Sequence, residues 1–160
     1  MVASFLAIDS ATRQRLEQNP SLVQAYLYPE DGEWPEGVYI DKAWHGIHYL
    51  LTGRAWGGDG PLALAVMGGK EIGTSGDFSP RLLSEAQVQE ITTALSGIDA
   101  ETFAKRFDAK AMTKADIYPD RIWERDGKDA LDYVVHYFND MVAFYREAAE
   151  RGDAAILKLG

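Results

Sequence analysis

Residues 41–53 decide the fold of this chain, and they read DKAWHGIHYLLTG. Apolar side chains recur in this stretch at the three- and four-residue spacing of one helix face. Asp41 is typical of a helix N-cap and Gly53 of the left-handed residue that ends a helix, so the stretch predicts a helix with a defined start and end. The buried face of this helix would carry Trp44, Ile47, His48 and Leu51.

Hydrophobic patterning on both sides of this stretch predicts a mixture of helices and strands. We expect strands at residues 4–8 and 154–159, and further helices at residues 10–19, 21–28, 61–67, 84–95, 99–107 and 128–151. The order of these elements predicts an α+β fold, in which a small mixed sheet packs against several helices and a long C-terminal helix is followed by a terminal strand. Pairing of the first and last strands would tie both ends of the chain into the sheet. Residues 1–160 are expected to form a single domain.

Composition limits the possible classes of function. The chain holds no cysteine, which excludes disulfides, thiolate metal sites and cysteine nucleophiles. Its net charge of −9 argues against DNA or RNA binding, which depends on an excess of Lys and Arg. The first residues lack the basic segment of a signal peptide, and no stretch is long and apolar enough to span a bilayer. We therefore expect a cytoplasmic protein that binds neither nucleic acid nor membrane.

Four stretches of the chain, taken in order, resemble one known family. The first is the pattern Asp41-Lys42-x-Trp44-x-x-x-His48-x-x-Leu51-Thr52-Gly53. The others are Leu6-x-Ile8-Asp9, Pro61-Leu62-x-x-Ala65-Val66-x-Gly68 and Ile117-Tyr118-Pro119. Together they resemble the YfbM-like family of small bacterial proteins, a domain of unknown function, over nearly the whole chain. The resemblance implies an α+β fold and no established activity.

The predicted helix and the glycine-rich loop after it hold the candidate cleft or ligand-binding residues. These residues are Asp41, Lys42, Trp44, His45, His48, Thr52 and Trp56. Two interpretations of His48 stay open: a buried histidine with a backbone or Asp partner, or a histidine at the floor of a cleft walled by Trp44 and Trp56. Lys42 is either a solvated residue of the first turn or a ligand for an anion at the helix N-terminus. Thr52 is expected to be structural.

The spacing of these residues argues against a metal site and against a phosphate-binding loop. His45 and His48 are three residues apart, rather than the four of a zincin helix, and no Glu lies between them. Residues 53–60, GRAWGGDG, lack the glycine patterns of known phosphate-binding loops. The G-x-S-x-G motif of a serine nucleophile is also missing. We therefore expect no catalytic residue, no metal and no cofactor.

Two loops outside this region carry weaker signals. Residues 30–36 are acidic and include Trp34, which either folds back onto the core or is an exposed interface anchor. Residues 73–77 are expected to form a turn without a specific functional signal.

The sequence favours a non-catalytic binding module over an enzyme. A compact acidic domain is suited to binding and neutralising a basic protein partner, because opposite charges steer the association. The alternative is a small-molecule-binding protein or an enzyme with a histidine-centred cleft around His48, in which the imidazole acts as general base or hydrogen-bond donor. A third hypothesis is a homo-oligomer contact through exposed aromatic residues, and the sequence leaves the oligomeric state open.

Overall fold

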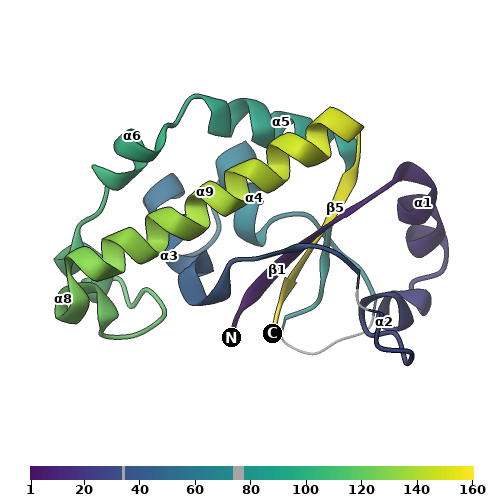
Figure 1. Cartoon of the computed structure of the whole chain (residues 1–160), viewed down its shortest axis with the longest axis horizontal. Coiled ribbons are helices and arrows are strands. Elements are labelled where there is room, and N and C mark those ends of the chain that lie inside the picture. The colour runs from purple at the N-terminus through teal and green to yellow at the C-terminus, as the bar shows by residue number, and fades with distance from the viewer. Residues whose placement is uncertain (34, 74–77) are drawn as a thin grey trace.

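The computed structural model describes residues 1–33, 35–73 and 78–160 of the chain. Within them, β1 (Ala3–Ile8) pairs with β5 (Ala154–Leu159) along its whole length. The remaining strands are β2 (Val38–Tyr39), β3 (Lys70–Glu71) and β4 (Arg81–Leu83), and the strand order in the sheet is β2-β1-β5-β4-β3. The expected pairing of the first and last strands is therefore confirmed, and the two chain ends lie side by side (Figure 1).

Every pairing between the described strands is antiparallel, so the sheet differs from the mixed sheet expected from the sequence. A parallel pair would need a crossover that returns the chain to the same end of the sheet. Instead, helix α9 (Lys128–Arg151) carries the chain to the end at which β1 stops, and β5 runs back beside β1 (Figure 1). The long C-terminal helix and the terminal strand after it are as predicted.

Helices make up most of the structure and surround the sheet. Those before α9 are α1 (Ser10–Gln18), α2 (Leu22–Leu27), α3 (Trp44–Thr52), α4 (Pro61–Met67), α5 (Glu85–Ser96), α6 (Ala100–Ala104), α7 (Ala109–Lys114) and α8 (Ile122–Asp126). A short 3₁₀ helix, Asp41–Ala43, leads into α3. The α+β class predicted from the sequence is therefore confirmed.

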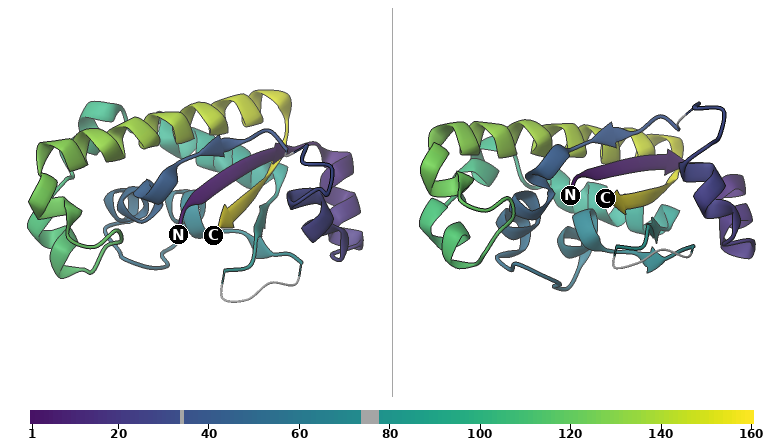
Figure 2. Two further views of the ribbon diagram at one scale, coloured as in Figure 1. Left: turned by 60° about the horizontal axis from the view of Figure 1, so that its bottom comes forward. Right: turned by 90° about the horizontal axis from the view of Figure 1, so that it is seen from below.

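The two faces of the sheet carry separate hydrophobic clusters, because alternate residues of a strand point to opposite sides. Phe5 of β1 joins the larger cluster, which packs against α3, α4, α5 and α9. Leu6 joins the smaller cluster, together with Leu16 of α1 and Leu27 of α2. Figure 2 shows α9 running along the sheet, and α1 and α2 grouped at one end of the molecule. The candidate residues therefore lie on the side of the sheet that holds the larger cluster.

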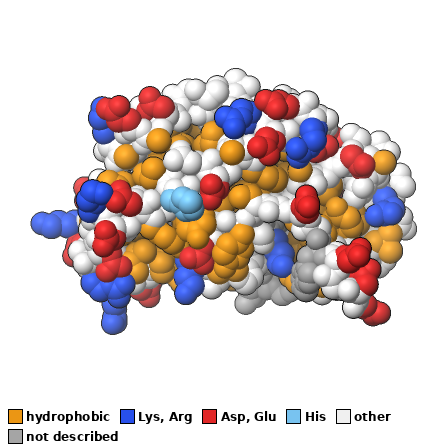
Figure 3. Space-filling model, viewed as in Figure 1, with side chains coloured by type: hydrophobic (Ala, Val, Ile, Leu, Met, Phe, Trp, Pro, Cys, Tyr) orange, Lys and Arg blue, Asp and Glu red, His pale blue; other side chains and the backbone are white. Residues whose placement is uncertain are grey.

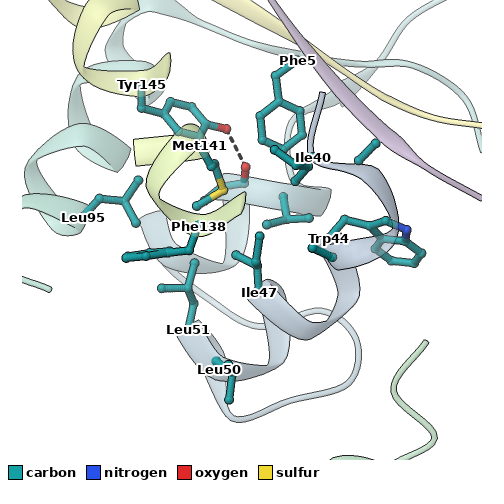
Figure 4. Packing of buried hydrophobic residues seen from close by; sticks show 14 of the residues in the cluster. Phe5, Ile40, Trp44, Ile47, Leu50, Leu51, Leu95, Phe138, Met141 and Tyr145 are labelled. Atoms are coloured by element: carbon teal, nitrogen blue, oxygen red, sulfur yellow. Dashed lines mark hydrogen bonds between the residues drawn. The ribbon is translucent and has the colours of Figure 1, made fainter. Parts of the chain in front are cut away.

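Inside the larger cluster, α3 packs against α9. Ile47 and Leu51 of α3 point toward Phe138 of α9 (Figure 4). Tyr145 of α9 is fully buried, and its hydroxyl donates to the carbonyl oxygen of Ala65 in α4 at 2.5 Å. Full burial of one large apolar side chain contributes about 1.5–3 kcal/mol to stability. The packing of Ile47 and Leu51 on Phe138 therefore holds α3 firmly against α9.

A glycine inside α3 allows a close approach to α8. A Cβ atom added at Gly46 would lie 2.6 Å from Cη2 of Trp123. The Trp123 ring is fully buried, and its Nε1–H donates to the carbonyl oxygen of Ile117 at 2.6 Å. The ring therefore packs on the helix backbone at a place where any other residue would obstruct it.

Two of the sequence predictions lie outside the described residues. These concern Trp34 and most of the expected turn at residues 73–77. Within the ranges that are described, no helix is long and apolar enough to cross a membrane.

Candidate functional site

Helix α3 begins later than the sequence predicted. Its first residue is Trp44, and its N-cap is Ala43, which has no side-chain acceptor. Asp41 instead opens the preceding 3₁₀ helix with a φ of +47°, a conformation that Asp tolerates better than most residues. The prediction that Asp41 caps this helix is therefore wrong, because its carboxylate is engaged elsewhere.

The carboxylate of Asp41 accepts hydrogen bonds from two tyrosines. The Tyr133 hydroxyl of α9 donates to Oδ2 at 2.9 Å, and the Tyr39 hydroxyl donates to Oδ1 at 3.4 Å. The backbone N–H of Lys42 donates in turn to the Tyr133 oxygen at 3.1 Å. Burial, followed by the neighbouring Asp41 carboxylate, raises the pKa of Tyr133, so the hydroxyl keeps its proton at neutral pH. Asp41 and Lys42 therefore join the start of α3 to α9, and Lys42 itself is exposed.

His45 uses both ring nitrogens in hydrogen bonds to the backbone. Nδ1 accepts from the N–H of Tyr118 at 2.9 Å, and Nε2 lies 2.7 Å from the carbonyl oxygen of Ala55. These partners assign the neutral tautomer with its proton on Nε2, because a carbonyl oxygen can only accept. Burial lowers the pKa of His45, which keeps the ring neutral. His45 therefore holds two loops against α3 and has no free nitrogen for chemistry.

The His45 ring belongs to an aromatic cluster. Its other members are Trp44, Trp56 and Tyr118. The Trp44 and His45 rings stack with centroids 4.9 Å apart, and the Trp56 centroid lies 4.4 Å from that of His45. The ring centroid of Tyr118 lies 5.8 Å from that of Trp44. Trp44 is 1% exposed whereas Trp56 is 58% exposed. The cluster therefore buries one indole in the core and presents another to solvent.

His48 is buried like His45 but lacks comparable partners. Its side chain is fully buried, and neither ring nitrogen makes a hydrogen bond with any described residue. The backbone of Gly57 is close enough to favour the charged ring, although without hydrogen-bond geometry, but burial outweighs it and lowers the pKa of His48 to about 4. His48 is therefore a neutral, sealed residue, and neither the expected backbone or Asp partner nor an open cleft is found at it.

Thr52 closes the C-terminal end of α3. Its hydroxyl donates to the carbonyl oxygen of His48 at 2.8 Å and accepts from the N–H of Arg54 at 3.1 Å. Gly53 has the left-handed φ of +71° predicted for a helix end, and its N–H donates to the carbonyl oxygen of Tyr49 at 2.7 Å. The Thr52 hydroxyl is therefore engaged in hydrogen bonds that close the helix end.

Two pockets formed by the described residues lie away from the histidines. A pocket of about 370 Å³ at the end of α3 is lined by Thr52, Gly53 and Arg106, among others, but by neither His45 nor His48. A pocket of about 400 Å³ lies elsewhere, between β2 and α9. Among the described residues, no group of three or more His, Asp or Glu is arranged to hold a metal ion.

Sequence reasoning did not identify the partners that hold these residues. Tyr118 binds His45 across 73 positions of the chain, and Tyr133 binds Asp41 across 92. Tyr118 lies in one of the four stretches that carry the family resemblance, and His45 lies in another. A contact between these two stretches could therefore have been predicted from the resemblance. Nothing in the local pattern around Tyr133 distinguished it from the other tyrosines of α9.

The fold and the site define the class of this protein as an α+β domain built around an aromatic cluster and two buried histidines. Residues 1–158 match the model of a family described as a domain of unknown function (DUF1877), and the chain belongs to this family. A solved structure, YfbM from Escherichia coli, itself a protein of unknown function, is 23% identical with a TM-score of 0.77, over 98% of each chain. At this identity the likeness shows a shared fold. No curated protein matches the chain significantly.

Proposed function

We propose that this chain is a non-catalytic protein-binding module that docks a partner on the exposed face of Trp56. The observation that carries the proposal is an indole that is 58% exposed while one part of its ring lies against His45. Tryptophan is among the residues that contribute most to protein interfaces when a partner covers it. Because His45 is itself held by two backbone hydrogen bonds, Trp56 loses little conformational freedom on binding.

The partner expected at this surface is a basic protein. The net charge of −9 attracts a protein of opposite charge and repels nucleic acids and other acidic surfaces. Association should therefore be fast at low ionic strength and slow down as salt screens the attraction. A partner that is a second copy of the chain would instead appear as a dimer in sedimentation of a dilute sample.

The test is affinity capture with matched variants. The immobilised protein is exposed to lysate of the cells that express it at low and moderate salt, and bound proteins are identified by mass spectrometry. Trp56→Ala should lose the specific partner, whereas Leu22→Ala, which removes a side chain 41% exposed on α2, should retain it. Equal capture by both variants, or no partner for the unaltered protein, would refute docking on Trp56.

A second candidate function is a small-molecule site or enzyme centred on His48. One observation favours it, namely that both ring nitrogens of a fully buried histidine lack partners among the described residues. Such a site would require the loop of residues 53–60 to open, because the ring is fully buried and the backbone of Gly57 lies close to it. Modification by diethyl pyrocarbonate followed by peptide mapping tests this, with the exposed His136 as the positive control. Rapid modification of His48 in the folded protein would support the cleft, and its protection would argue against it.

A further inference from the structure

A groove of about 400 Å³ runs between β2 and the second half of α9, away from the aromatic cluster. We call it the β2–α9 groove. Its apolar lining comes from Ala7, Val38, Ala143 and Phe144. β2 lies at one edge of the sheet, so one side of the groove is bordered by a strand that has no further described strand beside it.

Carboxylates line this groove without cationic partners. Glu36, Asp140 and Glu147 contribute to its walls, and none forms an ion pair with a described Lys or Arg. The ion-pair partner of Asp140 among the described residues is the exposed His136, at 3.5 Å. Arg151, the cation among the described lining residues, is already paired with Asp153 at 2.8 Å. On the face of the molecule where α9 lies, Figure 3 shows hydrophobic side chains with both acidic and basic side chains around them.

This combination suits the side chains of Lys and Arg. Both carry a long apolar stem and a charged head, and they bind best where the stem lies on an apolar surface and the head meets an acid. A groove with an apolar floor and unpaired carboxylates on its walls offers both contacts. The volume accommodates more than a single small ion, and an edge strand is the usual place for an extended segment to pair.

We propose that the β2–α9 groove binds an extended basic segment of a protein partner. The Lys or Arg stems lie over Ala143 and Phe144, and their charged heads meet Glu36, Asp140 and Glu147. This inference rests on the proposed function of a protein-binding module and names the part of the partner that its acidic charge recognises. It concerns a surface separate from Trp56, so a failure of this inference can be distinguished from a failure of docking on Trp56.

The probe is a fluorescein-labelled peptide, Lys-Val-Lys-Val-Lys with blocked ends, measured by fluorescence anisotropy at low salt. The triple variant Glu36→Gln, Asp140→Asn, Glu147→Gln should weaken its binding at least tenfold. A matched control, Glu30→Gln, Glu90→Gln, Glu124→Gln, removes the same charge from exposed positions outside the groove and should weaken binding less than threefold. Circular dichroism confirms that both variants are folded.

The outcomes separate this inference from the proposal about Trp56. Trp56→Ala should leave peptide binding unchanged, and amide NMR signals of Val38 and Tyr39 should shift when the peptide binds the unaltered protein. Equal weakening by both triple variants would show that only net charge attracts the peptide, and would overturn the inference. Absence of peptide binding, or equally tight binding of spermidine, would also overturn it, the latter because a small polyamine would then suffice.

Discussion

The aromatic cluster and the β2–α9 groove differ in how their polar atoms are used. In the cluster, both ring nitrogens of His45 are hydrogen-bonded to the backbone, and His48, which lies beside the cluster on the same helix, is sealed from solvent. In the groove, Glu36 and Glu147 have no ion-pair partner among the described residues. The two histidines that stand out in the sequence are thus either bonded to the backbone or buried away from solvent, whereas the acids of the groove remain accessible to a partner. Availability of polar atoms, rather than residue type, distinguishes the two regions.

This difference should also appear in stability. Trp44 and His45 of the cluster lie in the core, so their removal should cost folding free energy, whereas Trp56 is largely exposed. Side chains of the groove walls lie at the surface and should matter for binding alone. Substitutions in the two regions test this division, and native domains are stable by only about 5–15 kcal/mol, so the largest effects will be readily measured.

The largest effect is expected from Trp44→Ala. Trp44 is 1% exposed, stacks on His45, and donates from Nε1 to the carbonyl oxygen of Met1 at 3.3 Å. Loss of a buried Trp side chain costs about 3–5 kcal/mol in unfolding free energy. Urea unfolding followed by circular dichroism measures the loss. Trp56→Ala is the matched control and should cost about 1 kcal/mol or less, and a comparable loss in both would place Trp56 in the core rather than at a binding surface.

A pH dependence of stability should follow from His48. Its pKa in the folded protein is about 4, below the value of 6.5 in the unfolded chain. The unfolded state therefore binds the proton more readily, so stability falls as pH decreases from about 6.5 to about 4, by roughly 3 kcal/mol in total. Burial lowers the pKa of His45 as well, which adds to the same trend. Urea midpoints measured across this pH range give the slope.

The variant His48→Leu isolates the contribution of this ring. It removes two unpartnered nitrogens from the core, so the free energy of unfolding at pH 7 should rise by about 1 kcal/mol. Its stability should also depend less on pH between about 6.5 and 4. If the curves for the two proteins run parallel, His48 is protonated without difficulty in the folded state, and the sealed position described for it is wrong.

A smaller loss is expected from Gly46→Ala. Alanine is favoured over glycine inside a helix by about 1 kcal/mol, but here the new Cβ would lie 2.6 Å from the Trp123 ring. Overpacking of a core typically costs about 1–3 kcal/mol, so after the helix gain a net loss of up to about 2 kcal/mol should appear in thermal or urea unfolding. Gly97→Ala is the control, because its Cβ would meet only the Ala94 carbonyl oxygen at 3.6 Å, and it should be neutral or slightly stabilising. Equal effects of the two substitutions would show that the Trp123 ring moves away freely.

Much of the fold could be predicted because it depends on local patterns. The periodicity of residues 128–151 and Gly152 after them gave both ends of α9, and Ser84 with Gln87 forms the capping box that begins α5. The pairing of β1 with β5 followed from two apolar stretches at the chain ends. The antiparallel direction of every pairing did not follow, because it depends on where each connecting helix delivers the chain.

The site was less predictable because its contacts join distant parts of the chain. The helical spacing placed His48 on the buried face correctly, but spacing alone does not reveal which partner a ring nitrogen finds. The Tyr118 N–H that binds His45 and the Tyr133 hydroxyl that binds Asp41 arrive from other elements. The groove could not be predicted for the same reason. Glu36 and Glu147 lie more than a hundred positions apart in the sequence, and the packing of α9 on the sheet brings them together.

The smallest effect on stability is expected from neutralising the groove. Glu36→Gln, Asp140→Asn and Glu147→Gln together should change the free energy of unfolding by about 0.5 kcal/mol or less, because no Lys or Arg partner among the described residues is lost. The direction should be toward greater stability, since the change reduces the self-repulsion of a chain with a net charge of −9. The triple variant at Glu30, Glu90 and Glu124 should behave alike in urea unfolding. A loss above about 2 kcal/mol confined to the groove variant would mean that its carboxylates hold the fold together, and the contrast between an occupied cluster and an available groove would then fail.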